Sequence, residues 1–323
     1  MNSDARWMGA ALALATRGVG RTAPNPPVGC VLVRDGRVVG RGWTQPGGRP
    51  HAEAMALEQA GALARGATAY VTLEPCAHLS PRGPMCADLL TDAGVARVVV
   101  AIQDPDPRTN GDGIERLEAA GIAVTTGIEA LQAERVMAGF FARRRRGRPS
   151  VTLKLALSMD GKIALPNGES RWITGERARA HGHIERARCE MIVVGRGTFE
   201  ADAPALNVRL PGLEARSPRR AVMTTGTAPN GWERLNSPQA IATFESVDHV
   251  LVEGGAGAAS AFLRADLVDR LLIHRAPILI GAGRDAIGDI GLGDLAAAHG
   301  RWRLIDTRLL GSDRIEVYER VRG

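Results

Sequence analysis

Strand-like and helix-like segments alternate along this 323-residue chain in two successive series, without an internal sequence repeat. This alternation constrains the fold strongly, because strands separated by helices build an open sheet with helices on both faces. The first series is a helix at 4–18, strands at 28–33 and 37–42, a helix at 51–64, a strand at 69–73, a helix at 86–94, a strand at 97–102, a helix at 113–121, a strand at 122–127 and a helix at 129–142. We expect one α/β domain over residues 1–146.

The pattern restarts after an arginine-rich run, RRRRGRPS, at 143–150. We expect this run to be a solvated linker, with an anion-binding patch as the alternative. The second series is a strand at 151–158, a helix at 175–188, strands at 190–195, 219–224 and 249–255, a helix at 257–266, a strand at 267–280 and paired strands at 302–310 and 314–320. The chain is long enough for two domains, and we place the second, also α/β, at 147–323.

A potential metal site lies in the first series. The chain reads PHAE around His51 and Glu53, then LEPC ending at Cys76, then GPMC ending at Cys86. One imidazole and two thiolates suit Zn²⁺ and leave a fourth coordination position for water, as in catalytic zinc sites. Glu53 can then move a proton, which is the pattern of zinc-dependent base deaminases. Four cysteines could instead be small hydrophobic residues, but the order of these motifs favours zinc.

The local sequence also predicts where these ligands lie. His51 follows Pro50 and is expected to open a helix. Cys76 follows Pro75 just past a strand, and we expect it at a helix N-terminus, where the helix dipole favours a thiolate.

Composition limits the cellular compartments and the classes of partner that suit this chain. No stretch is long and apolar enough for a membrane span, and the first residues predict an amphipathic helix rather than a signal peptide, so we expect a cytoplasmic protein. Cysteines there bind metal more often than they form disulfides. Only Lys154 and Lys162 are lysines among 41 basic residues. Guanidinium cannot replace a compact ammonium, so we expect at least one of them to serve a site.

Several longer motifs resemble those of a known enzyme family. They are PNPPVGCVLV at 24–33, PHAEAMAL at 50–57, GATAYVTLEPCAH at 66–78, DPDP at 104–107, KLALSMDGKIA at 154–164, GESRWIT at 168–174 and VEGGAGAASAFL at 252–263. Over nearly its whole length the chain resembles the bifunctional deaminase–reductases of riboflavin biosynthesis. The resemblance implies a cytidine-deaminase-like three-layer α/β/α domain, followed by a dihydrofolate-reductase-like α/β domain.

The resemblance also implies two reactions on one phosphorylated pyrimidine. The first domain would use Zn²⁺ to remove an amino group from 2,5-diamino-6-ribosylamino-4(3H)-pyrimidinone 5′-phosphate by hydrolysis. The second would use NADPH to reduce the ribosyl group to ribityl.

In the first site, the family roles fall on His51, Cys76 and Cys86 as zinc ligands and on Glu53 as the proton shuttle. Asn25 would read the pyrimidine, although an asparagine before proline is also a common turn residue. His78 would contact the substrate or support a ligand rather than bind zinc itself.

In the second site, the resemblance makes Lys154 the catalytic group and Asp202 an acid near cofactor and substrate. The implied substrate positions are Ser170, Arg186, Leu206, Arg209 and Glu253. The implied cofactor positions are Ala156, Trp172, Thr198, Asp202, Thr225, Gly255, Ala256 and Gly257. The last three open a helix, a favourable place for pyrophosphate, and the two arginines suit bidentate phosphate binding.

Two departures from the family pattern stand out. The loop between the cysteines is one residue longer than usual, with Met85 in place of a proline. The region 224–248 is short, and Thr224 and Thr225 replace an Asp-Ser pair, so the choice between NADPH and NADH stays open.

Two other functions compete with this one. A nucleic-acid base deaminase with a basic RNA-binding second domain would explain the net charge of +6, but aromatic residues make up only 4% of the chain. A ligand sensor that had lost activity would not need Glu53 and all three zinc ligands. We therefore expect a small-molecule enzyme without nucleic-acid or membrane partners, and a homodimer through the reductase half is possible by family resemblance.

Overall fold

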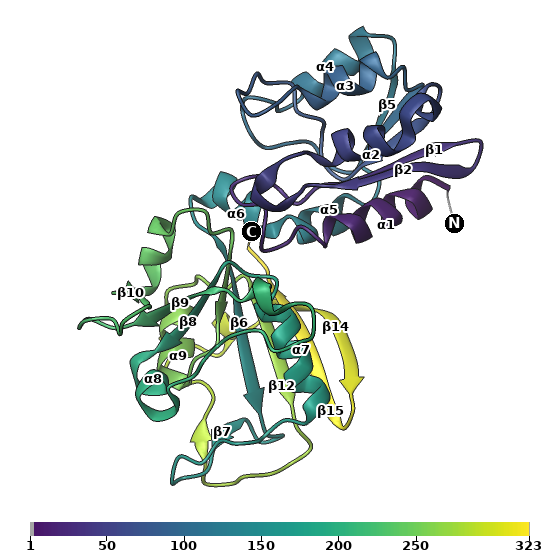
Figure 1. Cartoon of the computed structure of the whole chain (residues 1–323). Coiled ribbons are helices and arrows are strands. Elements are labelled where there is room, and N and C mark those ends of the chain that lie inside the picture. Colours follow the sequence, from purple (N-terminus) through teal and green to yellow (C-terminus); the bar gives the residue numbers. More distant parts are fainter. Residues whose placement is uncertain (1–2, 323) are drawn as a thin grey trace. The chain divides into compact units, whose positions relative to one another are not determined.

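The computed structural model describes residues 3–322 and divides the chain into two compact units, Met1–Gly147 and Arg148–Gly323 (Figure 1). Each unit has a sheet and a hydrophobic core of its own. We describe the units one at a time.

The first unit is built on a five-stranded sheet in the order β2-β1-β3-β4-β5. β1 is antiparallel to β2 and β3, and β3, β4 and β5 are parallel. The strands are β1 (Gly29–Arg34), β2 (Arg37–Trp43), β3 (Thr68–Val71), β4 (Arg97–Val100) and β5 (Ala123–Thr126). The helices are α1 (Ser3–Ala15), α2 (Ala52–Ala60), α3 (Cys86–Asp92), α4 (Asp112–Ala119), α5 (Ala130–Val136) and α6 (Ala138–Arg146), with short 3₁₀ turns at Pro46–Gly48 and Gly61–Ala64.

Glycines allow the first two helices to approach this sheet closely, one on each face. A Cβ on Gly29 of β1 would lie 1.9 Å from the carbonyl oxygen of Ala11 in α1. A Cβ on Gly42 of β2 would lie 2.0 Å from the carbonyl oxygen of Ala52 in α2. Gly42 pairs with Cys30, the neighbour of Gly29, so the two glycines face opposite sides of the sheet. The three-layer α/β/α prediction is confirmed (Figure 1).

The second unit contains an eight-stranded sheet in the order β10-β9-β8-β11-β6-β12-β15-β14, with β15 antiparallel to β12 and β14 and the other pairs parallel. Its strands are β6 (Ser150–Leu157), β8 (Met191–Gly195), β9 (Arg219–Met223), β10 (Glu233–Leu235), β11 (His249–Val252), β12 (Arg270–Arg275), β14 (Trp302–Leu310) and β15 (Asp313–Arg320). A small separate sheet pairs β7 (Lys162–Ala164) with β13 (Arg284–Asp285). The helices are α7 (Glu176–Arg186), α8 (Arg196–Asp202) and α9 (Ala256–Arg264), with 3₁₀ turns at Glu214–Arg216, Pro238–Thr243 and Ala296–Ala298.

The central strand β6 has two different faces. Val151, Leu153, Leu155 and Leu157 are buried in the main core of this unit, which also contains residues of α9. The residues between them, among them Lys154, are less buried and point to the other face. The period of two along β6 thus turns the lysine away from the apolar core.

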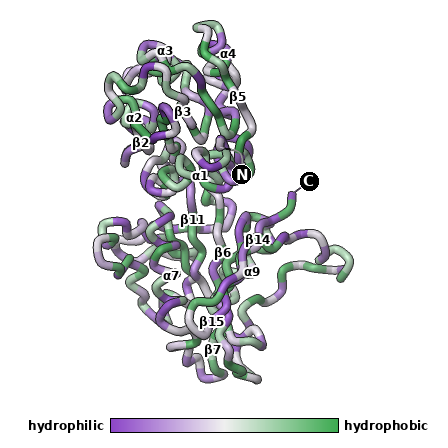
Figure 2. The backbone as a smooth tube through the Cα atoms, turned by 90° about the vertical axis from the view of Figure 1, so that its right-hand side faces the viewer, coloured by the Kyte–Doolittle hydropathy of each residue, from purple (hydrophilic) through white to green (hydrophobic). Residues whose placement is uncertain are grey.

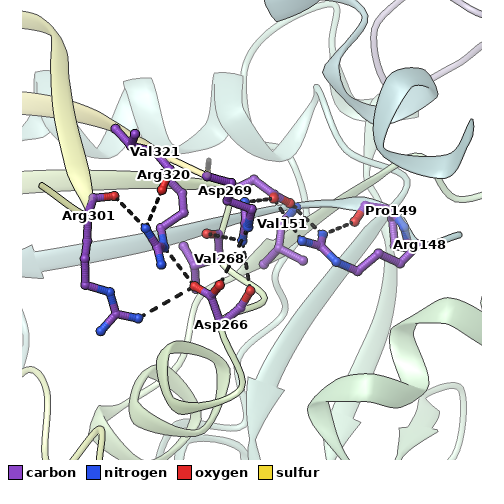
Figure 3. A network of polar contacts seen from close by, with 10 residues as sticks. Arg148, Pro149, Val151, Asp266, Val268, Asp269, Arg301, Arg320 and Val321 are labelled. Atoms are coloured by element: carbon purple, nitrogen blue, oxygen red, sulfur yellow. Dashed lines mark hydrogen bonds and ion pairs between the residues drawn. The ribbon is translucent and has the colours of Figure 1, made fainter. Parts of the chain in front are cut away.

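An ion-pair network joins the first residues of the second unit to its last strand region (Figure 3). The Arg148 guanidinium donates to both carboxylate oxygens of Asp269 at 2.7 and 2.9 Å, and the backbone N–H of Val151 donates to Asp269 at 2.9 Å. Arg320 donates to Asp266 at 2.8 Å, and Arg322 to Asp269 at 2.6 Å. Arg148 is buried. The expectation of a solvated linker at 143–150 is right in part: residues 144–147 are exposed and the boundary between the two units follows Gly147. It is wrong as to structure, since α6 continues through Arg146 and β6 begins at Ser150.

Two further predictions need correction. Cys76 does not open a helix; it lies in an irregular segment after β3, and Cys86 is the first residue of α3. The strand expected at 267–280 covers only β12, because Pro277 has no N–H to donate to a ladder.

Hydrophobic and hydrophilic residues are interleaved along the chain (Figure 2). No helix in residues 3–322 combines the length and the apolar character that a membrane crossing needs.

The close approach of β2 to α2 leads to a prediction. Gly42→Ala should lower the free energy of unfolding by about 1–3 kcal/mol, because the added methyl overlaps backbone rather than a mobile side chain. Gly9→Ala is the matched control: Gly9 lies in α1 with no atom within 4 Å of an added Cβ, so it should stabilise by about 0.5–1 kcal/mol. Urea denaturation followed by circular dichroism compares them. Equal midpoints would contradict the close approach.

Candidate active sites

His51, Cys76 and Cys86 come together in the first unit. His51 is the N-cap of α2, Cys76 follows β3, and Cys86 begins α3. The Nδ1 atom of His51 lies 3.3 Å from Sγ of Cys86 and 3.6 Å from Sγ of Cys76, and all three ligand atoms lie within 4.8 Å of one another. Tetrahedral zinc with bonds of about 2.0–2.3 Å separates its ligands by about 3.6 Å. The residues fit a zinc ion bound through Nδ1 and two sulfurs.

The two cysteines differ in acidity. A hydrogen bond from the Cys86 thiol lowers the pKa of Cys76 to about 4, and the same bond, together with burial, raises the pKa of Cys86. Zinc requires both sulfurs as thiolates, so binding must release the proton that they share.

Glu53 lies beside this set, in the first turn of α2, and is buried. Burial raises the pKa of its carboxyl group. A raised pKa brings a carboxyl group nearer to the pH at which it can both accept and return a proton.

Asn25 contacts the histidine ligand from the opposite side. Its Nδ2 lies 3.0 Å from Nε2 of His51 and donates to the Gly48 carbonyl at 2.9 Å. Gly48 has a φ of 87°, and a Cβ there would lie 2.8 Å from Asn25. A larger residue at 48 would push the asparagine away from the imidazole. Asn25 therefore helps to orient His51.

A buried carboxylate that the sequence analysis did not single out organises the next loop. Glu74 is 2% exposed and accepts hydrogen bonds from the backbone N–H groups of Asp104, Gly111, Gly113 and Ile114, at 2.9–3.3 Å. Its place in LEPC, two residues before a ligand, was the available signal. It anchors residues 104–114 next to Cys76.

His78 is fixed by that same loop. Its Nδ1 lies 3.0 Å from Oγ1 of Thr109, a residue that is fully buried. The three ligand atoms found together do not include His78. This agrees with a role beside the zinc ligands rather than as one of them.

In the second unit, the predicted Lys154, Arg186 and Glu253 lie together. Glu253 follows β11, Arg186 ends α7, and two hydrogen bonds of 2.8 Å join the guanidinium to the carboxylate. The Lys154 ammonium is 3.9 Å from the same carboxylate. Burial by itself raises the pKa of Glu253, but Lys154 and Arg186 outweigh it and hold the pKa at about 2. The site therefore contains a fixed anion between two cations.

Buried histidines lie close to this group. Nδ1 of His181 in α7 is 3.2 Å from Nε2 of His274 in β12, and His274 pairs with Ala156 of β6. Burial, and after it the charge of Lys154, lowers the pKa of His274 to about 3. His274 is thus neutral near the lysine.

The predicted cofactor turn is also assembled. The backbone N–H of Gly255, the N-cap of α9, donates to Oγ1 of Thr198 at 3.0 Å. Thr198 lies in α8 after β8, and β8 and β11 are neighbours, so the carboxyl ends of two parallel strands meet here. Ligands of open α/β sheets bind at such an edge.

The other predicted residues of this unit differ in their exposure. Trp172 is 66% exposed with the Arg179 guanidinium 4.7 Å from its ring centre, and Asp202 is 3.9 Å from Arg171. Arg209 and Thr225 are exposed, and Ser170, Ala156 and Ala256 are half-buried. Leu206 is buried with a φ of 53°, and Gly257 is exposed.

The fold and the metal-binding set of the first unit define a zinc-binding deaminase. Residues 1–102 match the model of the cytidine and deoxycytidylate deaminase zinc-binding region, and residues 149–246 and 234–315 match that of the RibD C-terminal domain. The chain belongs to the RibD family of bifunctional riboflavin biosynthesis enzymes, which joins a zinc-dependent deaminase to an NADPH-dependent reductase.

Relatives match almost the whole chain. The riboflavin biosynthesis protein RibD of Escherichia coli K12 is 38% identical, with 96% of this chain and 97% of that protein covered. Its counterpart in Mycobacterium tuberculosis H37Rv is 40% identical, covering 95% and 94%. Among solved structures, Acinetobacter baumannii RibD (form 1) has a TM-score of 0.87 at 36% identity, covering 99% of both chains. A Thermotoga maritima diaminohydroxyphosphoribosylaminopyrimidine deaminase/5-amino-6-(5-phosphoribosylamino)uracil reductase has a TM-score of 0.87 at 31% identity, covering 98% and 99%.

The ligand geometry predicts the metal content. The purified protein should bind one zinc ion per chain, and Cys86→Ser should lose it because two ligands cannot hold zinc tightly. Cys189→Ser, which changes a buried cysteine of the second unit, is the matched control and should keep the metal. Elemental analysis after dialysis measures both, and retention of zinc by Cys86→Ser would contradict the assignment. Affinity should fall as the pH is lowered, because protons compete for the thiolates.

Proposed function

We propose that residues 1–146 deaminate 2,5-diamino-6-ribosylamino-4(3H)-pyrimidinone 5′-phosphate and that residues 147–323 then reduce its ribosyl group to ribityl with NADPH. The observation that carries the first step is the convergence of His51, Cys76 and Cys86 beside buried Glu53. The reactions named for the Thermotoga maritima structure support the substrate. A nucleic-acid substrate is not favoured.

In the deaminase, His51, Cys76 and Cys86 would hold the zinc ion. Bound zinc supplies a Lewis acid that lowers the pKa of its water to about 7. Glu53 takes one proton from the attacking water and delivers it to the ring nitrogen, and then carries the second proton of that water to the amino group, which leaves as ammonia. Asn25 holds His51 and faces the pyrimidine, and His78 borders the substrate.

In the reductase, NADPH supplies the hydride that is added at C1′ of the opened sugar. Lys154 supplies the proton that the nitrogen attached to C1′ gains, as the C=N bond of the open-chain form becomes the C–N bond of the ribitylamino group. Glu253 orients Lys154. Arg186 in turn holds Glu253 in place, because the Arg186 guanidinium is itself fixed by a hydrogen bond from its Nη1 to the Asn207 carbonyl at 3.1 Å. Exposed Arg209 is then the better placed of the two arginines to bind the substrate phosphate.

The remaining predicted residues complete the two ligand sites. Ser170, Leu206 and Glu253 would line the substrate. The cofactor would lie against Ala156, Trp172, Thr198, Asp202, Thr225, Gly255, Ala256 and Gly257. The Gly255–Gly257 turn at the start of α9 supports pyrophosphate binding, because it offers backbone N–H groups.

We further propose a cytoplasmic enzyme that dimerises through its reductase half. All four cysteines are free, which suits a reducing compartment.

Glu53→Gln tests the proton shuttle. Deamination should fall by about 10²–10⁴-fold because the amide cannot carry the proton, while zinc content and NADPH-dependent reduction of deaminated substrate stay normal. Mass spectrometry of the products, with and without NADPH, measures both reactions in one chain. Wild-type deamination by this variant would refute the assignment.

Lys154→Ala tests the second site. Reduction should fall by about 10²–10⁴-fold through loss of the proton donor, and deamination should be unchanged. Lys162→Ala is the matched control, because Lys162 pairs with the exposed Asp285 at 2.6 Å. If Lys154→Ala still forms the ribityl product at the normal rate, the lysine has only a structural role.

A further inference from the structure

One side chain of the arginine run, that of Arg144, contacts the segment between β4 and α4 in the first unit. Arg144 of α6 places Nη2 2.8 Å from Oδ2 of Asp106, in the segment that joins β4 to α4. The Asp106 side chain is only 5% exposed, so this ion pair is shielded on the carboxylate side. Arg145, the next residue, pairs instead with Glu134 of α5.

Asp106 makes several of the hydrogen bonds that hold this segment together. Its carbonyl accepts the N–H groups of Thr109 at 2.8 Å and Asn110 at 3.0 Å, and its own N–H donates to Asp104 at 2.9 Å. Arg108 also binds its carboxylate, at 2.6 and 3.0 Å, but belongs to the same segment. Arg144 comes from a different element and ties the segment to α6.

This segment also contacts His78, beside the zinc ligands. Thr109, positioned by the Asp106 carbonyl, holds Nδ1 of His78 through its hydroxyl at 3.0 Å. His78 follows the ligand Cys76 by two residues. A continuous set of hydrogen bonds therefore runs from Arg144 through Asp106 and Thr109 to a side chain at the deaminase site.

Asp106 lies among other buried carboxyl groups. Glu74, Asp104 and Asp106 are all buried in this region. Burial raises the pKa of Asp104 to about 6, whereas Arg108 and, less strongly, Arg144 hold the pKa of Asp106 at about 2. Without Arg144, the carboxylates would repel one another with less compensation.

We propose that Arg144 is a positioning residue for deamination, which acts on His78 through Asp106 and Thr109. This rests on the proposed deaminase function and adds a residue that no motif of that site contains. Of the run at 143–146, Arg144 thus serves the first active site through its pair with Asp106.

The test compares three full-length variants, each loaded with zinc. Arg144→Met should lower the kcat of deamination about 10- to 100-fold, the usual cost of losing a supporting partner, with KM changed less than about threefold. Arg144→Lys keeps one cation for a single contact and should recover most of the rate. Arg145→Met, the matched control, should behave as wild type.

A double-mutant cycle tests the route. Thr109→Val removes the hydroxyl that holds His78, and Thr109→Ser restores it. If Arg144 acts through Thr109, Arg144→Met combined with Thr109→Val should lose hardly more than the stronger single variant. Multiplying losses would overturn the route, and a normal kcat in Arg144→Met would overturn the proposal.

Two measurements distinguish a folding defect in a variant from a failure of the proposal. Zinc content shows whether the first unit of each variant is folded, and reduction of deaminated substrate shows the same for the second unit. If Arg144→Met does not bind zinc, a normal kcat in Thr109→Val refutes the proposal. If the wild type itself does not deaminate, the proposed function fails and this inference with it.

Discussion

The buried carboxylate of Glu74 is the interaction on which the first site depends. Four backbone N–H groups from residues 104–114 converge on it, and Cys76 lies two residues further along the chain. A buried carboxylate without such donors would cost several kcal/mol. Because the donors belong to one segment, the ligand-bearing loop, the start of α4 and Thr109 share a single anchor. In the second unit, Glu253 is held by side-chain cations instead, since its carboxylate lies between Arg186 and Lys154.

Polar contacts also replace apolar packing beneath α7. The residues of this helix that face the sheet include His181 and Glu185, and they meet His274 and Arg270 of β12. Replacing one member of such a buried set leaves a charge or a donor without a partner. The helix that ends at Arg186 is therefore held in one position relative to β12, and Arg186 can present a fixed guanidinium to Glu253.

The sequence predicted the parts of the sites that follow a local motif. His51, Cys76 and Cys86 have the residue types that zinc needs, and the strand and helix pattern placed His51 at the start of a helix and Cys76 just past a strand. Long-range polar contacts could not be foreseen: Arg144 and Asp106 are 38 residues apart, and an arginine pattern says nothing about its acceptor. The prediction of a helix at Cys76 was wrong because other contacts fix the chain there. Glu74 binds backbone N–H groups of residues 104–114, and Cys76 contacts His51 and Cys86.

The ligand set has a consequence for the unfolded chain. Coordination would join residues 51 and 86, so the metal is a removable cross-link that closes the intervening segment into a loop. Closing a loop lowers the conformational entropy of the unfolded state, and the ligands exist as a preformed set only in the folded one. Both effects act on one unit alone, because the ligands all lie before residue 147. Bound metal would therefore stabilise the first unit, to which all three ligands belong.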